Sequence, residues 1–238
     1  MKILALESSA VAASVAVSED GALIAQSYQR SGLTHSRTLM PMCRDLLENC
    51  GLTLGEMDVV AVAAGPGSFT GLRIGVATAK GLAWPGDKPC AGVSTLEAMA
   101  WPLAHLEGDL CAVMDARRHQ VYNARFQAEG GRLLRLCPDR AISIDELAAE
   151  LLSREKTQIL VGDGAELCYN ELTKRGLPVR LAPPHLVIQS AWGVALAAAE
   201  LAGRGGLVTA AGLEPVYHRL SQAERERLAR QQAAADDR

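Results

Sequence analysis

The sequence lacks the excess of positive charge that nucleic-acid binding requires. Its 238 residues include 24 lysines and arginines against 27 aspartates and glutamates, so the formal net charge is −3. A protein that binds nucleic acid by itself neutralises phosphates with a clustered basic surface. The composition argues against such a protein, and a nucleic-acid substrate would need a second protein to hold it.

Long apolar runs are also missing. The longest uncharged candidate, residues 59–72, contains Gly-Pro-Gly and is not apolar enough to span a bilayer. The N-terminal stretch MKILALESSA does not have the basic region and long apolar core of a signal peptide, because Glu7 interrupts it. We therefore expect a cytoplasmic protein that does not contact the membrane.

The six cysteines form no C-x-x-C pair, and the five histidines are equally dispersed. In a reducing compartment, scattered cysteines behave as small buried hydrophobic residues. We therefore favour buried thiols over disulfides or a metal site.

What the sequence does contain is a glycine-rich stretch, AAGPGSFTGLRIGVATAKGLA, at residues 63–83. A glycine-rich turn that opens a helix offers unpaired backbone N–H groups to an anion such as phosphate. A Walker loop, however, ends in Gly-Lys-Ser/Thr where this chain has Gly-Leu-Arg, and a dinucleotide fingerprint has glycine where Thr70 stands. The stretch either holds an anion or is only a tight turn.

Periodicity predicts two successive copies of one structural plan. The second half repeats the order of the first about 108 residues later, which indicates domain duplication. A capping box opens the first helix of the second copy at Ser143 and Glu146, and an alanine-rich helix with a serine cap spans residues 190–203. In the first copy we expect a helix over residues 34–49 and strands at residues 2–7, 11–18, 22–28, 59–64 and near Cys90.

Two tandem copies of three strands followed by helix, strand and helix resemble the actin-like ATPase superfamily. The predicted class is therefore α/β, with two tandem actin-like (RNase H-like, βββαβα) domains whose mixed sheets are flanked by helices. We place the N-terminal domain at residues 1–100 and the C-terminal domain at residues 101–220, with helix 190–203 packing back on the first domain. Residues 221–238 form a polar tail.

In that superfamily a nucleotide lies between the domains, cradled by hairpins that resemble Asp-x-Gly turns. The carboxylate holds magnesium through water, and glycine lets the backbone approach a phosphate. Here the corresponding turns read ESSA and DARR, without glycine, so Cβ atoms crowd the space that phosphate oxygens need. This weighs against ATP hydrolysis, and the alternative is that the two acids cap turns at strand ends. The residues of these vestigial hairpins are Glu7, Ser8, Ser9 and Asp115.

Several motifs, in order, resemble the TsaB (YeaZ) family of bacterial tRNA threonylcarbamoyladenosine biosynthesis proteins. They are LALESSAVAASVAV, THSRTLMPMCRDLL, GPGSFTGLRIGVATAKGLA, GVSTLEAMA, DARRHQVYNARF and EPVYHRL, and they span the chain from Met1 to about residue 220. The resemblance implies a non-catalytic scaffold that pairs with TsaD. TsaD is the paralogous subunit that transfers threonylcarbamoyl to N6 of the adenosine 3′ of the anticodon in ANN-decoding tRNAs.

The same resemblance implies further partners and few ligands. It implies TsaE as a third component, tRNA contact only through the complex, and a homodimer when TsaD is absent. It implies no tightly bound cofactor, and only a weak ATP or ADP site at the junction of the complex.

The resemblance also implies that the metal site of TsaD is lost. TsaD holds its metal with an Asn-His-Leu-Glu-x-His segment where this chain has STLEAM. The two ligand positions fall on Thr95 and Met99, and neither side chain can replace imidazole on iron or zinc. The nearby HLEGD at residues 105–109 imitates the lost segment, but it comes about ten residues late, and we expect His105 to be a loop residue.

The family pairs through its first two helices, which form a helical bundle with their counterparts in the partner. The first helix carries an apolar stripe, and the second carries small residues at spacing four that leave one side nearly bare. Some of the bare side packs on the first helix of its own domain, and the resemblance implies that the apolar stripe is shared between the core and the interface. We expect Leu39→Asp to abolish pairing and to leave the monomer folded, and we expect the loop glycines to set the helix geometry. The predicted interface residues are Leu39, Met42, Cys43, Leu46, Gly71, Gly75 and Ala79.

Two enzymatic alternatives compete with the scaffold. An independent actin-like ATPase or sugar kinase needs a catalytic Asp in the cleft and glycine-bearing hairpins. A metal-dependent glycoprotein peptidase needs the ligand spacing that Thr95 and Met99 break, and the sequence contains no His-Glu-x-x-His and no evident Ser/His/Asp set. The scaffold is the favoured interpretation.

Overall fold

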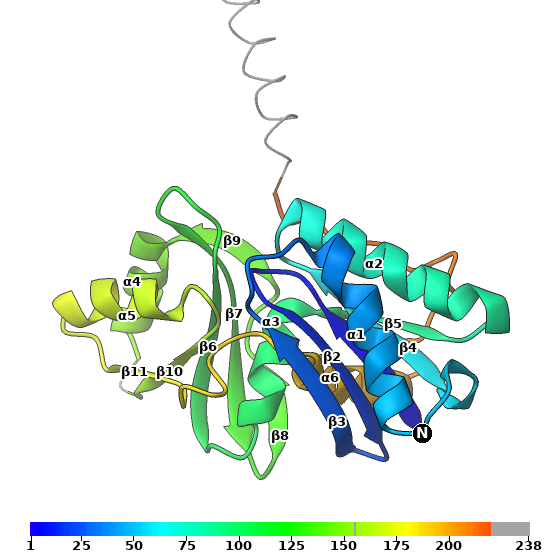
Figure 1. Ribbon diagram of the computed structural model, residues 1–238. Coiled ribbons are helices and arrows are strands. Elements are labelled where there is room, and N and C mark those ends of the chain that lie inside the picture. Colours follow the sequence, from blue (N-terminus) through cyan, green and yellow to red (C-terminus); the bar gives the residue numbers. More distant parts are fainter. Residues whose placement is uncertain (155, 220–238) are drawn as a thin grey trace, which may run out of the picture.

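Two β-sheets organise the part of the chain that the computed structural model describes, residues 1–154 and 156–219 (Figure 1). The predicted tail, residues 221–238, lies outside the described residues. The first sheet has the order β3-β2-β1-β4-β5, with β4 and β5 parallel to β1 and with β2 antiparallel to both β1 and β3. Its strands are β1 (Lys2–Glu7), β2 (Ala13–Glu19), β3 (Ala22–Gln29), β4 (Val59–Gly65) and β5 (Cys90–Ser94).

The first sheet is covered on both faces. Alternate residues of β1 point to opposite sides, so that Leu4 and Leu6 pack against helices α1 and α2 while Ile3 and Ala5 pack against α6. Helix α6 follows the second sheet in sequence and lies on the first one. The helices on this sheet are α1 (His35–Asn49), α2 (Phe69–Ala83) and α6 (Ala191–Gly203), and the short 3₁₀ turns nearby are Leu54–Glu56 and Trp84–Gly86.

The second sheet repeats the arrangement, with the order β11-β10-β6-β7-β8 and with β9 paired to β7. Helix α3 covers one face and helices α4 and α5 cover the other. The elements are β6 (Gly108–Asp115), β7 (Gln120–Glu129), β8 (Arg132–Arg135), β9 (Arg140–Ser143), β10 (Gln158–Val161), β11 (Val179–Leu181), α3 (Thr95–Ala100), the 3₁₀ turn Trp101–Leu103, α4 (Ile144–Leu152) and α5 (Ala165–Lys174).

Local sequence signals placed most helix starts correctly. The capping box at Ser143 and Glu146 forms, with the Ser143 amide 2.7 Å from Glu146 Oε2 and the Glu146 amide 3.1 Å from Ser143 Oγ. Ser190 occupies the N-cap position of α6, as predicted, but its side chain makes no hydrogen bond to the helix. Strand β2 begins at Ala13, two residues later than predicted, and β9 and β11 had no clear signal because each is only three or four residues long.

All six cysteines are free thiols. None of the helices in the described part of the chain combines the length and the hydropathy needed to cross a membrane.

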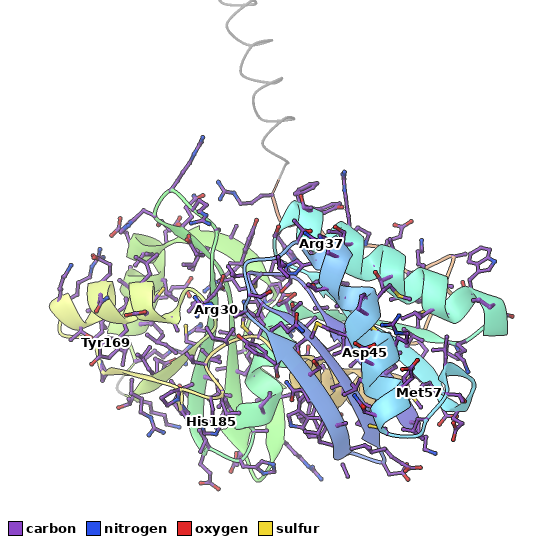
Figure 2. All side chains as sticks on the ribbon, viewed as in Figure 1. Arg30, Arg37, Asp45, Met57, Tyr169 and His185 are labelled. Carbon is purple, nitrogen blue, oxygen red and sulfur yellow. The ribbon has the colours of Figure 1, made fainter. Side chains whose placement is uncertain are left out.

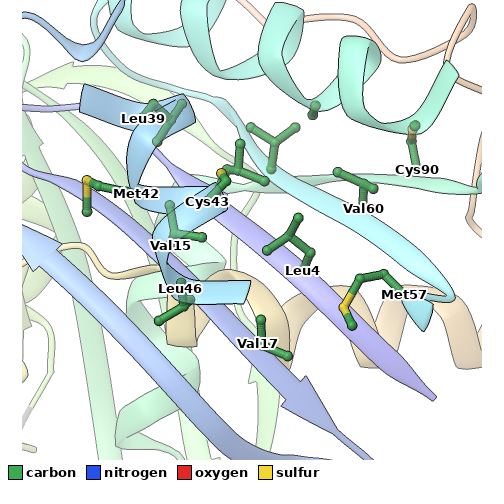
Figure 3. Close-up of a cluster of buried hydrophobic side chains, with 14 of the residues drawn as sticks. Leu4, Val15, Val17, Leu39, Met42, Cys43, Leu46, Met57, Val60 and Cys90 are labelled. Atoms are coloured by element: carbon green, nitrogen blue, oxygen red, sulfur yellow. The ribbon is translucent and has the colours of Figure 1, made fainter. Parts of the chain in front are cut away.

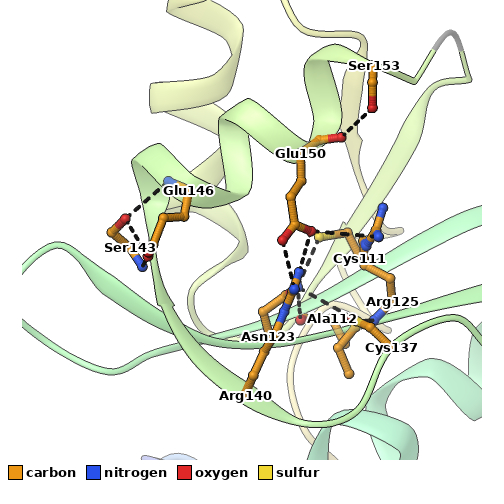
Figure 4. A network of polar contacts seen from close by, with 11 residues as sticks. Cys111, Ala112, Asn123, Arg125, Cys137, Arg140, Ser143, Glu146, Glu150 and Ser153 are labelled. Atoms are coloured by element: carbon orange, nitrogen blue, oxygen red, sulfur yellow. Dashed lines mark hydrogen bonds and ion pairs between the residues drawn. The ribbon is translucent and has the colours of Figure 1, made fainter.

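A polar network beneath β7 and β9 joins α4 to the second sheet (Figure 4). Glu150 accepts two hydrogen bonds from Arg140, of 2.8 and 2.6 Å, and lies 3.7 Å from the guanidinium of Arg125. Asn123, which is fully buried, accepts a third bond from Arg140 at 3.0 Å. The hydrogen bonds from Arg140 lower the pKa of Glu150. A paired network of this kind, anchored on the buried Asn123, fixes the position of α4 although Glu150 itself is partly open to solvent.

We expect Glu150→Gln to lower the free energy of unfolding by about 1 kcal/mol at pH 7, because it removes a charged acceptor from two arginines and the site is partly open to solvent. Since the folded-state pKa of Glu150 is lowered, the difference from the parent protein should shrink as the pH falls through that pKa. Urea unfolding at several pH values measures this difference in the free energy of unfolding. Glu200→Gln, which breaks only the exposed pair with Arg204, is the control and should change stability very little. Equal effects of the two variants would contradict the prediction.

Candidate functional site: the cleft between the domains and the helices beside it

A cleft of about 470 Å³ opens between the two domains. The loop after β1, the turn before α2 and the hairpin after β6 form its walls, so the matching loops of the two structural copies face each other. This volume is within the range of small-molecule sites. The lining residues are Ser9, Ala10, Val11, Gly67, Ser68, Phe69, Met114, Asp115, Ala116, Arg117, Tyr122, Asp163 and Arg219.

The glycine-rich stretch packs against the first hairpin. The Ser68 amide donates to the Ser9 carbonyl at 2.7 Å, and the Ser8 hydroxyl donates to the Gly71 carbonyl at 2.9 Å. A Cβ atom at Gly71 would lie 2.1 Å from the Ser8 carbonyl oxygen, and one at Gly75 would lie 2.5 Å from Ser8 Oγ. The glycines are therefore required for close approach of α2 to the hairpin. Both were predicted as partner contacts, and this is a correction: their bare side faces the chain's own hairpin.

Glu7 ends β1 in a buried position with 1% of its surface exposed. Its Oε1 atom accepts the Ser9 amide at 2.5 Å, and its Oε2 atom has no hydrogen-bond partner. Burial raises the pKa of Glu7 to about 7, the bonds from Ser9 oppose this rise, and the nearby carboxylate of Asp163 adds to it. Glu7 is thus a turn-capping acid whose burial favours the protonated form.

Asp115 occupies the matching place at the end of β6. Its carboxylate accepts the Arg117 amide at 2.7 Å and the Arg117 guanidinium at 3.2 Å. Asp115 therefore caps the turn after β6, which is the alternative to a nucleotide-binding role that the sequence left open. The next three residues form a left-handed run that residues other than glycine seldom adopt. They are Arg117, Arg118 and His119, with φ values of 63°, 56° and 58°.

Asp163 is the second carboxylate that lines the cleft, beside Asp115, and the sequence analysis missed it. It lies in the turn between β10 and α5, where its Oδ1 atom accepts the Gln189 side-chain amide at 3.0 Å. Burial raises the pKa of Asp163, and Asp115 contributes to the rise. The repeat itself could have indicated Asp163, because VGDG stands at the end of β10 as AAGPG stands at the end of β4.

The positions that would carry metal ligands in TsaD lie on α3, away from solvent. Thr95 and Met99 are 0% and 3% exposed, and the Met99 side chain lies against Gly162. His105 is in an exposed turn after the Trp101–Leu103 segment, as predicted. Within residues 1–154 and 156–219, no three His, Cys, Asp or Glu side chains gather as a metal site would require.

The predicted interface stripe of α1 is core in the structure (Figure 3). Leu39, Met42, Cys43 and Leu46 are at most 8% exposed and point toward Leu4, Val15 and Val60 of the sheet. Ala79 of α2 is fully buried as well. These residues cannot contact a partner without leaving the core, so Leu39→Asp is expected to unfold the domain, which corrects the expectation that the monomer would remain folded. The exposed surface of the same two helices consists of other residues.

Two tandem βββαβα domains that face each other across a cleft define the actin-like ATPase fold. A family model described as TsaD, tRNA N6-adenosine threonylcarbamoyltransferase, matches residues 29–171. The protein named tRNA threonylcarbamoyladenosine biosynthesis protein TsaB from Escherichia coli is 31% identical over 92% of this chain and 95% of its own length. Its Bacillus subtilis namesake is 34% identical over 70% of this chain and 73% of its own length. The chain belongs to the TsaB (YeaZ) family.

Solved structures agree with this assignment. YeaZ from Pseudomonas aeruginosa is 28% identical and superposes with a TM-score of 0.76, over 91% of this chain and 99% of that protein.

Proposed function

We propose that this chain is a cytoplasmic, non-catalytic accessory subunit. In this proposal it pairs with TsaD, and with TsaE, in the complex that transfers threonylcarbamoyl to N6 of the adenosine 3′ of the anticodon in ANN-decoding tRNAs. The name shared by its curated relatives supports a role in that pathway. Transfer RNA contacts the chain only within the complex, since the net charge is −3. Without TsaD, the same surface pairs two copies of the chain.

The observation that carries the pairing is the outer face of α1 and α2. The two helices lie side by side on one face of the first sheet, and in Figure 1 no other described element covers them. Arg37 and Asp45 project from the outer side of α1 (Figure 2), and Met40 between them is 47% exposed. Met is a flexible side chain suited to apolar contacts between proteins.

The outer side of α2 allows another helix to approach closely. Thr70, Ile74, Ala77 and Gly81 follow one another at spacings of three and four, so they share one face, and each is exposed or half-buried. A Cβ atom at Gly81 would meet nothing within 4 Å, which shows that this face is open in the single chain. This set replaces Gly71, Gly75 and Ala79 as the candidate interface residues of α2.

We expect Ala77→Arg to weaken pairing with TsaD by about tenfold to a hundredfold, because a long charged side chain would stand where the helices meet, and we expect the monomer to remain folded. Affinity is measured by titrating purified TsaD. Function is measured as threonylcarbamoyl transfer to an ANN-decoding tRNA by TsaD and TsaE, with threonylcarbamoyl-adenylate supplied and with or without this chain.

The matched control is Ala149→Arg, which places the same side chain on an exposed position of α4 in the second domain. It should pair and support transfer as the parent chain does. Transfer that is equally fast without the chain would overturn the accessory role. ATP turnover by the chain alone at a useful rate would favour the ATPase instead, and undiminished pairing of Ala77→Arg would reject this interface.

We propose that any ATP or ADP at the junction of the complex binds weakly and is not hydrolysed by this chain. The carboxylate of Asp115 is engaged by Arg117, and Glu7 is buried and accepts the Ser9 amide, so neither acid is placed to hold a hydrated magnesium ion in this arrangement. The side chains of Ser9 and Ala116 also stand where a glycine would let a phosphate approach.

A further inference from the structure

After α6, which lies on the first sheet, the chain follows the free edge of that sheet. Val208 exchanges two backbone hydrogen bonds with Cys90 of β5, of 2.8 and 2.9 Å, and the Val216 amide donates to the Ala64 carbonyl at 2.8 Å. A Cβ atom at Gly65 would lie 2.2 Å from the Val216 carbonyl oxygen. In Figure 1 this orange segment passes behind α2 to its N-terminal end. The motif EPVYHRL, which no step of the proposed function uses, lies at its end.

Tyr217 fastens the segment to the first turns of α2. Its ring stacks on Phe69 with the centroids 4.0 Å apart and the planes 3° from parallel. Its hydroxyl accepts a 3.0 Å hydrogen bond from Arg73 Nε, and the Arg73 guanidinium lies 5.1 Å from the centre of the Phe69 ring. A stacked pair with a cation beside it is a specific contact that depends on ring geometry.

Two residues later, Arg219 reaches the other domain. Its Nη1 atom donates to the carbonyl of Ala116, in the hairpin between β6 and β7, and its side chain forms part of the cleft wall. The residue after Ala116 begins the left-handed run at positions 117–119. Such a run persists only where neighbouring contacts hold it, and strained backbone of this kind gathers at functional sites.

We infer that residues 217–219 form an interdomain latch, in which Tyr217 and Arg219 position the N-terminal end of α2 relative to the hairpin of the second domain. Two residues of chain span at most about 7 Å, so the hairpin cannot move away from α2 without breaking one of the two contacts. The role in pairing rests on the proposed function, because α2 carries the candidate interface. A partner that binds the outer face of α2 therefore binds one fixed arrangement of the two domains.

The test compares four variants of the full chain: Tyr217→Ala, Tyr217→Phe, Arg219→Ala and Arg219→Lys. Hydrogen exchange is followed at two places, the hairpin at residues 116–120 and the first turns of α2 at residues 69–73. Affinity for TsaD is titrated in parallel. Arg118→Ala, in the same hairpin but with no hydrogen bond to the segment among the described residues, is the matched control.

If the latch exists, Arg219→Ala should speed exchange about tenfold in the hairpin and also in α2, although the hydrogen bond that it removes is made to the hairpin and not to α2. Tyr217→Ala should likewise speed hydrogen exchange in the first turns of α2, where Tyr217 packs, and also in the hairpin of the second domain. Tyr217→Phe, which keeps the stack, and Arg219→Lys, which keeps a donor, should restore most of the protection. Affinity for TsaD should fall severalfold in the two alanine variants and stay unchanged in Arg118→Ala.

Exchange that rises only next to each substitution would overturn the latch, because it would show two independent surface contacts. Unchanged exchange in both alanine variants would overturn it as well. The exchange experiment uses the chain alone. Failure of the parent chain to pair with TsaD would therefore reject the proposed function. The exchange rates would still show whether α2 and the hairpin are coupled.

Discussion

Replacing Gly71 by alanine is expected to lower the free energy of unfolding by about 3 kcal/mol, the upper end of the usual cost of overpacking. The new Cβ atom would lie 2.1 Å from the carbonyl oxygen of Ser8 and 3.2 Å from its carbonyl carbon. Both atoms belong to backbone that the strand β1 holds in place, so they cannot yield as a flexible side chain would. The shift would also disturb the 2.9 Å hydrogen bond from the Ser8 hydroxyl to the Gly71 carbonyl.

Gly81→Ala, in the same helix, is the matched control. A Cβ atom at Gly81 meets nothing within 4 Å, so the substitution should raise stability by about 0.5–1 kcal/mol through the better helix propensity of alanine. Urea unfolding, at a protein concentration where the chain is monomeric, gives both values. Stabilisation by Gly71→Ala would mean that α2 does not rest on the hairpin as closely as the structure places it.

The contrast between these two glycines explains the glycine-rich stretch. At Gly71 and Gly75 the missing side chains let α2 approach the hairpin after β1. The Ser68 amide, at the N-terminus of α2, is already bonded to the Ser9 carbonyl, which removes one donor from any anion. The stretch therefore sets the position of α2, and its geometric role follows from contacts within the chain.

Local pattern was sufficient to predict most of the architecture. Alternation and turn residues gave β1 with the correct ends, and the capping box at Ser143 gave the start of α4. The repeat then related Asp115 to Glu7. Asp115 ends β6 and lines the cleft, whereas Glu7 ends β1 and is buried directly beneath it. These signals act between residues close in sequence, or are present twice, so a single sequence reveals them.

The orientation of a helix was not predictable in the same way. An apolar stripe at helical spacing shows that one side of α1 is buried, but it does not show whether a sheet of the same chain or a partner buries it. Leu39 and Cys43 proved to be core, each 1% exposed, whereas the open face of α2 combines the half-buried Ile74 with small and polar residues such as Ala77 and Thr70, which do not form a hydrophobic stripe.

Contacts between distant segments were beyond sequence reasoning for a related reason. Tyr217 and Phe69 are separated by well over one hundred residues, and the segment that carries Tyr217 has no regular structure and hence no periodicity. Asp163 likewise acquires its place in the cleft only when β10 pairs with β6. Such positions depend on contacts between segments that are far apart in the sequence.

Glu7→Gln is expected to stabilise the protein by about 3 kcal/mol at pH 8 and to have little effect at pH 4. Burial raises the pKa of Glu7 from its ordinary value of 4.5 to about 7, so between these two values the folded protein keeps a proton that the unfolded chain has released. The stability of the parent protein should therefore fall as the pH rises from about 4.5 to about 7 and should change little from this group above that range. Glutamine keeps an oxygen that can accept the Ser9 amide, and it cannot ionise.

Urea unfolding from pH 4 to pH 8 gives the free energy of unfolding as a function of pH. Between about pH 4.5 and 7 Glu7 should add a downward slope to this curve in the parent protein, and Glu7→Gln should lack it. Glu146→Gln is the control of opposite sign, since its bonds to Ser143 lower the pKa of Glu146, and this variant should retain the descending slope. Parallel curves for the parent protein and Glu7→Gln would show that Glu7 titrates as an ordinary surface carboxylate. A descending slope in the parent protein and in Glu146→Gln, but not in Glu7→Gln, would show that Glu7 takes up a proton on folding, so that a magnesium ion at this hairpin would have to displace that proton.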